Sequence, residues 1–189
     1  MAGPPFDAAA PPADPDLRRA HVTGTPLWDG YQLVGGKYMW GQPGFQLLVT
    51  VRLENGDAVW VNEGWVPSDE VDLILLNERA IASPRTWQGL SRAWPEVEGA
   101  RYGEHKWNAV SPLAMAEVAG VRAPSFVLYE GEGLAPDADI PDRTPPIGGW
   151  RLEPQLRPHT EYALTWFSLS ATLLIVWCTA SLRKEGAED

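Results

Sequence analysis

The sequence predicts an α+β protein, in which a β-rich extramembrane domain with an antiparallel sheet and a few short helices precedes one C-terminal transmembrane helix. Three observations support this prediction. Residues 162–182 form an uncharged run of 21 residues. Short apolar runs separated by turn residues recur between residues 18 and 130, as expected of strands. Two short segments carry the start and stop signals of helices.

The uncharged run has the length of a membrane span. As a helix that rises about 1.5 Å per residue, it covers roughly 30 Å, the thickness of the hydrocarbon core of a bilayer. Charged residues flank it, with Arg157 and Glu161 before it and Arg183 and Lys184 after it. Two basic residues lie near each end when Arg151 is counted, so the positive-inside rule favours neither orientation.

The composition divides the chain into four parts. Residues 1–17 are rich in Ala, Pro and Asp, lack a basic start and an apolar stretch, and are expected to be a disordered tail rather than a cleavable signal. Residues 18–158 are expected to form the extramembrane domain, residues 159–183 the transmembrane helix and residues 184–189 a short tail.

A β-hairpin is the most specific local prediction in the domain. Residues 44–53 and 58–62 have strand composition, and Asn55-Gly56 lies between them. Asn-Gly between two apolar runs is a strong signal for a tight turn. Further strands are expected at residues 19–24, 31–34, 85–90 and 125–130.

Two short helices are expected beside the sheet. Ser68 is a candidate N-cap for a helix that runs to Asn77. Ser111 and Pro112 are a favourable pair at the start of a helix, and Gly120 is a favourable stop.

Charge and cysteine content exclude several classes of function. The formal net charge is −10, and residues 161–189 contribute only two of these negative charges, so the domain is acidic and nucleic acid is not an expected partner. The single cysteine, Cys178, allows neither an intramolecular disulfide nor a cysteine-based metal cluster. We find no Gly-rich phosphate loop, nucleophile elbow or zinc-protease motif, so an enzyme is not expected.

Of the three histidines, His159 has the most informative position. His21 and His105 are interpreted as structural residues of a strand and a loop. His159 stands just before the uncharged run, three residues from Tyr162 and seven from Trp166, so the three positions share one face if the helix extends to them. An imidazole at the water–lipid border could reach the iron of an amphipathic macrocycle. On physical grounds alone, an interfacial anchor or a helix cap is the simpler interpretation.

Two blocks resemble a known family. Residues 158–169 contain His-x-x-Tyr-Ala-x-x-Trp-Phe, which resembles the start of the second membrane helix of the Surfeit-locus (Surf-type) cytochrome c oxidase assembly factors. Residues 59–67, Val-Trp-Val-Asn-Glu-Gly-Trp-Val-Pro, are similar to that family's Val-x-Val-Asn-Arg-Gly-Trp-Val-Pro. Shorter matches at residues 22–25 and 86–90 keep the order, so the resemblance covers roughly residues 18–182.

The resemblance implies a membrane-anchored factor that assists maturation of subunit I of heme-copper oxidases and binds or escorts heme a. It implies that His159 is linked to the heme iron, with Tyr162 and Trp166 as candidates to line the site. The implied partners are cytochrome c oxidase subunit I and the machinery of heme a synthesis. The implied location is the bacterial cytoplasmic (inner) membrane, with the domain on the outer, periplasmic side.

The sequence departs from the family pattern at two places. Glu63 stands where the family has an arginine, in the block Asn62, Glu63, Gly64 and Trp65 that we mark as a candidate partner-binding site. The family also has a membrane helix before the domain, and none is visible in this sequence. The alternative hypothesis is a structural or accessory membrane subunit that binds no heme and stays associated with a respiratory oxidase.

Overall fold

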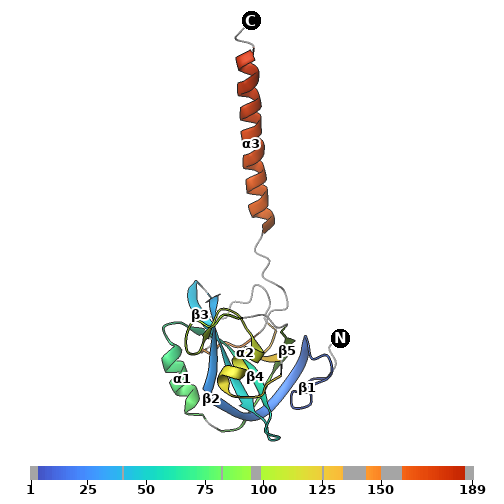
Figure 1. Ribbon diagram of the computed structural model, residues 1–189, viewed down its shortest axis with the longest axis vertical. Helices are drawn as coiled ribbons and strands as arrows, with labels where there is room; N and C mark the ends of the chain where they lie inside the picture. Colours follow the sequence, from blue (N-terminus) through green and yellow to red (C-terminus); the bar gives the residue numbers. More distant parts are fainter. Residues whose placement is uncertain are drawn as a thin grey trace. The chain divides into compact units, whose positions relative to one another are not determined.

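The computed structural model describes residues 4–39, 41–81, 83–94, 99–124, 126–133, 144–149 and 159–185. The side chains of residues 163–179 are described in the last of these ranges. The chain divides into two compact units, residues 1–152 and 153–189 (Figure 1). Each unit is described separately below.

The first unit is built on a sheet that closes on itself. Neighbouring strands follow the order β1-β2-β3-β4-β7-β5, and β5 also pairs with β2, which closes a five-stranded barrel. The long strand β2 makes this closure, because it pairs with β5 as far as Gly24 and with β3 from Thr25 onwards. The strands are β1 (Phe6–Asp7), β2 (Arg18–Met39), β3 (Gln42–Arg52), β4 (Ala58–Pro67), β5 (Arg85–Ala93), β6 (Lys106–Trp107) and β7 (Phe126–Glu130).

The predicted hairpin is confirmed. β3 and β4 pair in antiparallel fashion from Arg52 and Ala58 at the turn. Gly56 has a φ of +87°, which favours glycine, and the Asp57 backbone N–H donates to the Asn55 side chain (3.0 Å). The Asn-Gly pair thus supplies the local geometry that the turn needs.

The α+β class is confirmed, with corrections to the sheet. The expected strands 19–24 and 31–34 are parts of the single strand β2, which bends at two irregularities. The sheet is mixed rather than wholly antiparallel, because β7 pairs with β4 in parallel. The expected disordered tail also differs from the structure. Within it, β1 pairs with β2, and Ala8 is buried where its N–H donates to the carbonyl of His21 (2.8 Å).

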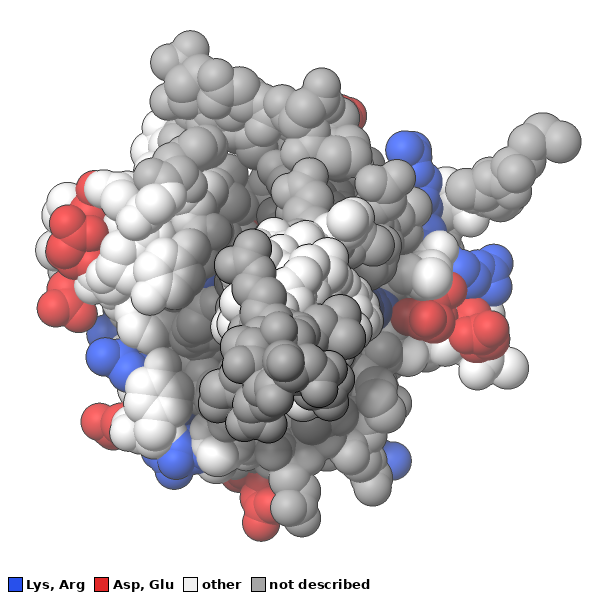
Figure 2. All heavy atoms as spheres, turned by 90° about the horizontal axis from the view of Figure 1, so that it is seen from above, with Lys and Arg blue, Asp and Glu red and all other residues white. Residues whose placement is uncertain are grey.

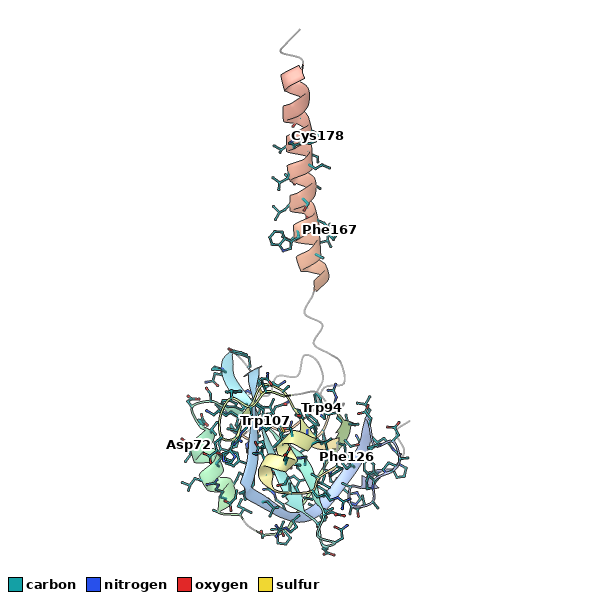
Figure 3. The ribbon with its side chains drawn as sticks, viewed as in Figure 1. Asp72, Trp94, Trp107, Phe126, Phe167 and Cys178 are labelled. Carbon is teal, nitrogen blue, oxygen red and sulfur yellow. The ribbon has the colours of Figure 1, made fainter. Side chains whose placement is uncertain are left out.

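Apolar side chains form two main cores, one on each side of the sheet. The interior of the barrel holds Leu33, Leu47, Val49, Val51, Val61, Trp87 and Leu128 among others. The outer face of β3, β4 and β7 is covered by α2, and Trp60 and Trp107 are buried in the second core there. Trp107 is labelled in Figure 3. Both indoles are hydrogen-bonded, with Trp60 donating to the carbonyl of Pro112 (3.1 Å) and Trp107 donating to Gln32 (2.6 Å).

The two short helices occur near their predicted positions. α2 (Pro112–Ala119) begins after Ser111 and ends at Gly120, whose φ of +66° gives the expected left-handed C-cap. The Ser111 side chain makes no capping hydrogen bond. α1 (Val71–Arg79) begins later than predicted, with Glu70 rather than Ser68 at the N-cap. Its buried residues Ile74 and Leu75 pack against the interior core of the barrel.

The second unit contains the helix α3 (His159–Glu185), which covers the predicted run of 162–182. Large apolar side chains are exposed along it, and Phe167 points away from the helix axis (Figure 3). Among the described residues, no helix is long and apolar enough to cross a membrane. The helix is therefore confirmed, whereas the membrane span stays a prediction.

Candidate functional site

A β-bulge in β4 determines the position of Glu63. Asn62 pairs with Leu48 and Gly64 pairs with Leu47, so Glu63 is the extra residue between two consecutive pairs of the ladder. Gly64 has a φ of +125°, and its N–H donates to the Asn62 side chain (3.0 Å). The bulge bends the strand and leaves the Glu63 side chain 5% exposed, on the same side as the interior residue Trp87.

Glu63 is held by donors from β5. Arg85 forms an ion pair with it (Nη2 to Oε1, 2.6 Å), and the Trp87 indole N–H donates to the same oxygen (2.9 Å). Arg85 also contacts Glu78 at the end of α1 (3.1 Å) and lies over the ring of Trp87. Burial raises the pKa of Glu63 above its ordinary value, and the Arg85 charge and the two hydrogen bonds oppose this effect.

A second carboxyl group lies beside Glu63. β4 and β7 run in parallel with Asn62 opposite Tyr129, which places Glu130 next to Glu63 and on the same face. Burial, followed by the charge of Glu63 and a hydrogen bond that the protonated Glu130 carboxyl group donates to Glu63, raises the pKa of Glu130 to about 8. Glu63 has two strong donors for its charged form, so Glu130 is the member of the pair that holds a proton at neutral pH.

The four charged groups gather at one end of the barrel. Arg85 is the first residue of β5 and Glu130 is the last residue of β7, and these two strands are antiparallel neighbours. We call Glu63, Glu78, Arg85 and Glu130 the carboxyl cluster. Within the described ranges, three carboxyl groups face one guanidinium group here, an imbalance that a bound proton reduces.

A short segment, residues 144–149, passes against the carboxyl cluster, and we call it the strap. Trp65 and Ile147 exchange two backbone hydrogen bonds (3.0 and 2.8 Å), and the N–H of Gly149 donates to the carbonyl of Glu130 (2.7 Å). A β-carbon built on Gly148 would lie 3.2 Å from the carbonyl oxygen of Glu130 and 3.4 Å from that of Glu63. The strap therefore contacts the backbone of both carboxyl-bearing residues.

The candidate partner-binding block is buried. Asn62, Glu63 and Trp65 are 1%, 5% and 5% exposed, and Gly64 is also buried. Their side chains contribute to packing and to the carboxyl cluster instead of forming a surface for another protein. Direct partner contact through this block stays untested, and burial argues against it.

The candidate heme-binding residues lie on α3, and Trp166 is the one whose side chain the structure describes. The backbone of α3 begins at His159, so His159, Tyr162 and Trp166 occupy positions i, i+3 and i+7 of one helix, as predicted. The side chains of His159 and Tyr162 lie outside the described residues. Trp166 is 56% exposed. Within the described part of the chain, no group of three or more His, Cys, Asp or Glu residues could hold a metal ion.

Sequence reasoning missed Arg85, Glu130 and the strap as parts of a site. The available signal was a glutamate inside or at the end of an otherwise apolar strand, which occurs at Glu63 and at Glu130. On the face shown in Figure 2, the coloured Lys and Arg side chains are interspersed with Asp and Glu side chains.

Comparison with known proteins identifies a family and a curated relative. Residues 1–171 match the SURF1 family, a range that includes both sequence blocks described above. Surfeit locus protein 1 from Xenopus tropicalis is 27% identical over 135 residues. The aligned stretch covers 68% of this chain and 41% of that protein, so the chain spans less than half of the length of this curated relative.

Proposed function

The chain belongs to the SURF1 family, and on this ground we propose that it is an assembly factor for cytochrome c oxidase and not an enzyme. The observation that carries the proposal is the family match over residues 1–171. The two sequence blocks that resemble the family lie on β4 and at the start of α3. The proposed partners are subunit I of the oxidase and the machinery that makes heme a.

Association with the oxidase distinguishes this proposal from the alternative. An assembly factor is expected to co-purify with immature subunit I and to be absent from the mature enzyme. Stoichiometric recovery of the chain with the mature oxidase would instead indicate a structural or accessory subunit that binds no heme.

We further propose that α3 binds heme a through His159, with Tyr162 and Trp166 lining the site. The helical backbone supports this proposal, because positions i, i+3 and i+7 fall on one face. The half-exposed indole of Trp166 provides an apolar surface on that face. When bound, the heme would supply an iron atom for the imidazole. The protein residues would hold the macrocycle loosely enough to release it.

A visible absorption spectrum tests the heme proposal. The full-length chain purified in detergent from cells that make heme a is expected to show a heme band, and His159→Ala is expected to remove most of it with the fold retained. His21→Ala is the matched control, because it deletes an imidazole from a half-buried position in β2. An equal heme content in His159→Ala and the wild type would refute the assignment of His159.

We also propose that α3 anchors the chain in the bacterial cytoplasmic membrane, with the domain on the outer side. The uncharged run in the sequence, 162–182, extends beyond the described side chains of 163–179. Leu164, Phe167 and Leu173 are at least 68% exposed on the helix. Ser170 and Thr172 donate their hydroxyl protons to carbonyls four residues earlier (2.9 and 2.8 Å), which removes unpaired donors from the helix surface.

Charged substitutions in α3 test the anchor. Each arginine at the centre of a membrane helix costs about 3 kcal/mol, so Leu173→Arg with Leu174→Arg is expected to move the protein from the membrane pellet to the soluble fraction after alkaline extraction. Leu73→Arg with Leu76→Arg is the control, because these leucines are similarly exposed on α1 of the domain. Retention of the α3 variant in the pellet at the wild-type level would contradict the proposal.

A further inference from the structure

Among the residues that the structure describes, the carboxyl cluster holds three carboxyl groups and one guanidinium group. Glu63 is 5% exposed and Glu78 is 18% exposed, and Arg85 is the guanidinium that contacts both. If Glu63, Glu78 and Glu130 were all ionised, the described part of the cluster would carry two excess negative charges at a partly buried place. Of the two carboxylates that contact Arg85, Glu78 is more exposed than Glu63, and water stabilises its charge. The excess charge therefore falls on Glu63 and Glu130.

The backbone leaves Glu63 and Glu130 little room to separate. β4 and β7 pair in parallel up to Asn62 and Tyr129, the residues directly before Glu63 and Glu130, and Glu130 is paired with Gly89 of β5. A β-carbon at Gly89 would lie 1.8 Å from the carbonyl oxygen of Tyr129, so β5 and β7 are in close contact beside Glu130. Like charges at adjacent positions of a sheet repel, and a shared proton removes the repulsion without any movement of the strands.

We propose that Glu63 and Glu130 share one proton in the folded protein, and that loss of this proton releases the strap from the end of the barrel. The strap is coupled to the pair through the backbone. It bonds to Trp65, two residues after Glu63, and to the carbonyl of Glu130 itself. Two ionised carboxylates that push β4 and β7 apart would therefore strain both sets of strap hydrogen bonds together.

The stability of the folded domain is expected to decrease as the pH rises. The folded protein holds the proton up to about pH 8, whereas an unfolded glutamate releases it near its ordinary value of 4.5. The folded form thus binds more protons between these values, and stability falls as the pH rises through this window and levels off above it. Glu63, Glu78 and Arg85 are the charged groups that face Glu130 from β4, α1 and β5.

The first test compares chemical unfolding of the full-length chain from about pH 6 to about pH 10. The wild-type midpoint is expected to fall as the pH rises to about 8 and then to stay constant. Glu130→Gln keeps a donor for Glu63 but cannot ionise, so its midpoint is expected to change much less. Glu132→Gln is the matched control, because it removes an exposed carboxylate two residues away and is expected to follow the wild type.

Hydrogen exchange of the strap locates the effect. After correction for the intrinsic pH dependence of exchange, the protection of the Ile147 and Gly149 amides is expected to fall by up to about tenfold per pH unit in the wild type until about pH 8. In Glu130→Gln the protection is expected to stay constant. Strap protection that is independent of pH in the wild type would overturn the proposed release.

An infrared measurement keeps the proposal testable if Glu130→Gln does not fold. The wild type at neutral pH is expected to show the carbonyl stretch of a protonated carboxylic acid, and this band is expected to disappear above about pH 9. Absence of the band at neutral pH would overturn the shared proton. Each of these results is independent of heme binding and of oxidase assembly.

Discussion

Replacement of Gly64 with alanine is expected to destabilise the domain by about 3 kcal/mol or more. The φ of +125° is strained for any residue with a β-carbon, at a cost of roughly 1–3 kcal/mol. In addition, the new β-carbon would lie 2.2 Å from the carbonyl oxygen of Ile147. Because this neighbour is backbone, the strap has to move, and its two hydrogen bonds to Trp65 weaken or break.

Gly56→Ala separates the two contributions to this loss. Gly56 also has a positive φ (+87°), but a β-carbon there would meet nothing within 4 Å. Its expected cost is therefore the backbone strain alone, about 1 kcal/mol. Urea unfolding of both variants measures the difference. If the two variants lose equal stability, then contact between Gly64 and the strap contributes nothing.

The local parts of the fold could be predicted from the sequence. The turn at Asn55-Gly56 and the helix between Ser111 and Gly120 depend on residues within one turn or one helix, and both occur where they were predicted. The fold class followed from the alternation of apolar runs and turn residues. β2 was predicted in two pieces, residues 19–24 and 31–34, whereas the strand continues through the residues between them.

The carboxyl cluster could not be predicted, because it depends on pairing over long distances in the sequence. Arg85 and Glu63 are 22 residues apart, and Glu130 reaches Glu63 only through the parallel pairing of β7 with β4. Parallel pairing leaves no short-range turn signal. The sequence marked Glu63 as a departure from the family's arginine, and the structure shows that the buried position is balanced by a guanidinium group from β5.

For α3, the structure tests the predicted helix but not the predicted ligand. Its residues were placed by helical spacing alone, and the helix from His159 to Glu185 confirms this spacing. The chemistry of His159 and Tyr162 depends on side chains outside the described residues, so it remains a proposal. Spacing predicts which residues share a face, whereas the ligand on that face has to be measured.

Arg85→Ala is expected to cost about 2–3 kcal/mol, at or below the lower end of the range for breaking a buried ion pair. The expected loss is this small because the Arg85 side chain is 27% exposed and water screens part of the interaction. The loss arises because Glu63 stays buried without its guanidinium partner. It is expected to grow as the pH rises, since a buried carboxyl group then has to remain ionised without compensation.

The double variant Glu63→Gln/Arg85→Ala decides whether the unpaired charge is the cause. The glutamine is neutral and can still accept the Trp87 hydrogen bond, so the double variant is expected to be more stable than the sum of the two single losses predicts. Arg92→Ala is the control, because this exposed residue of β5 lies over the Trp94 ring and forms no described ion pair. Additive losses would mean that Arg85 stabilises the domain through packing on Trp87 and not through Glu63. A strong coupling would instead show that the guanidinium group from β5 is what allows a glutamate to occupy the bulge in β4.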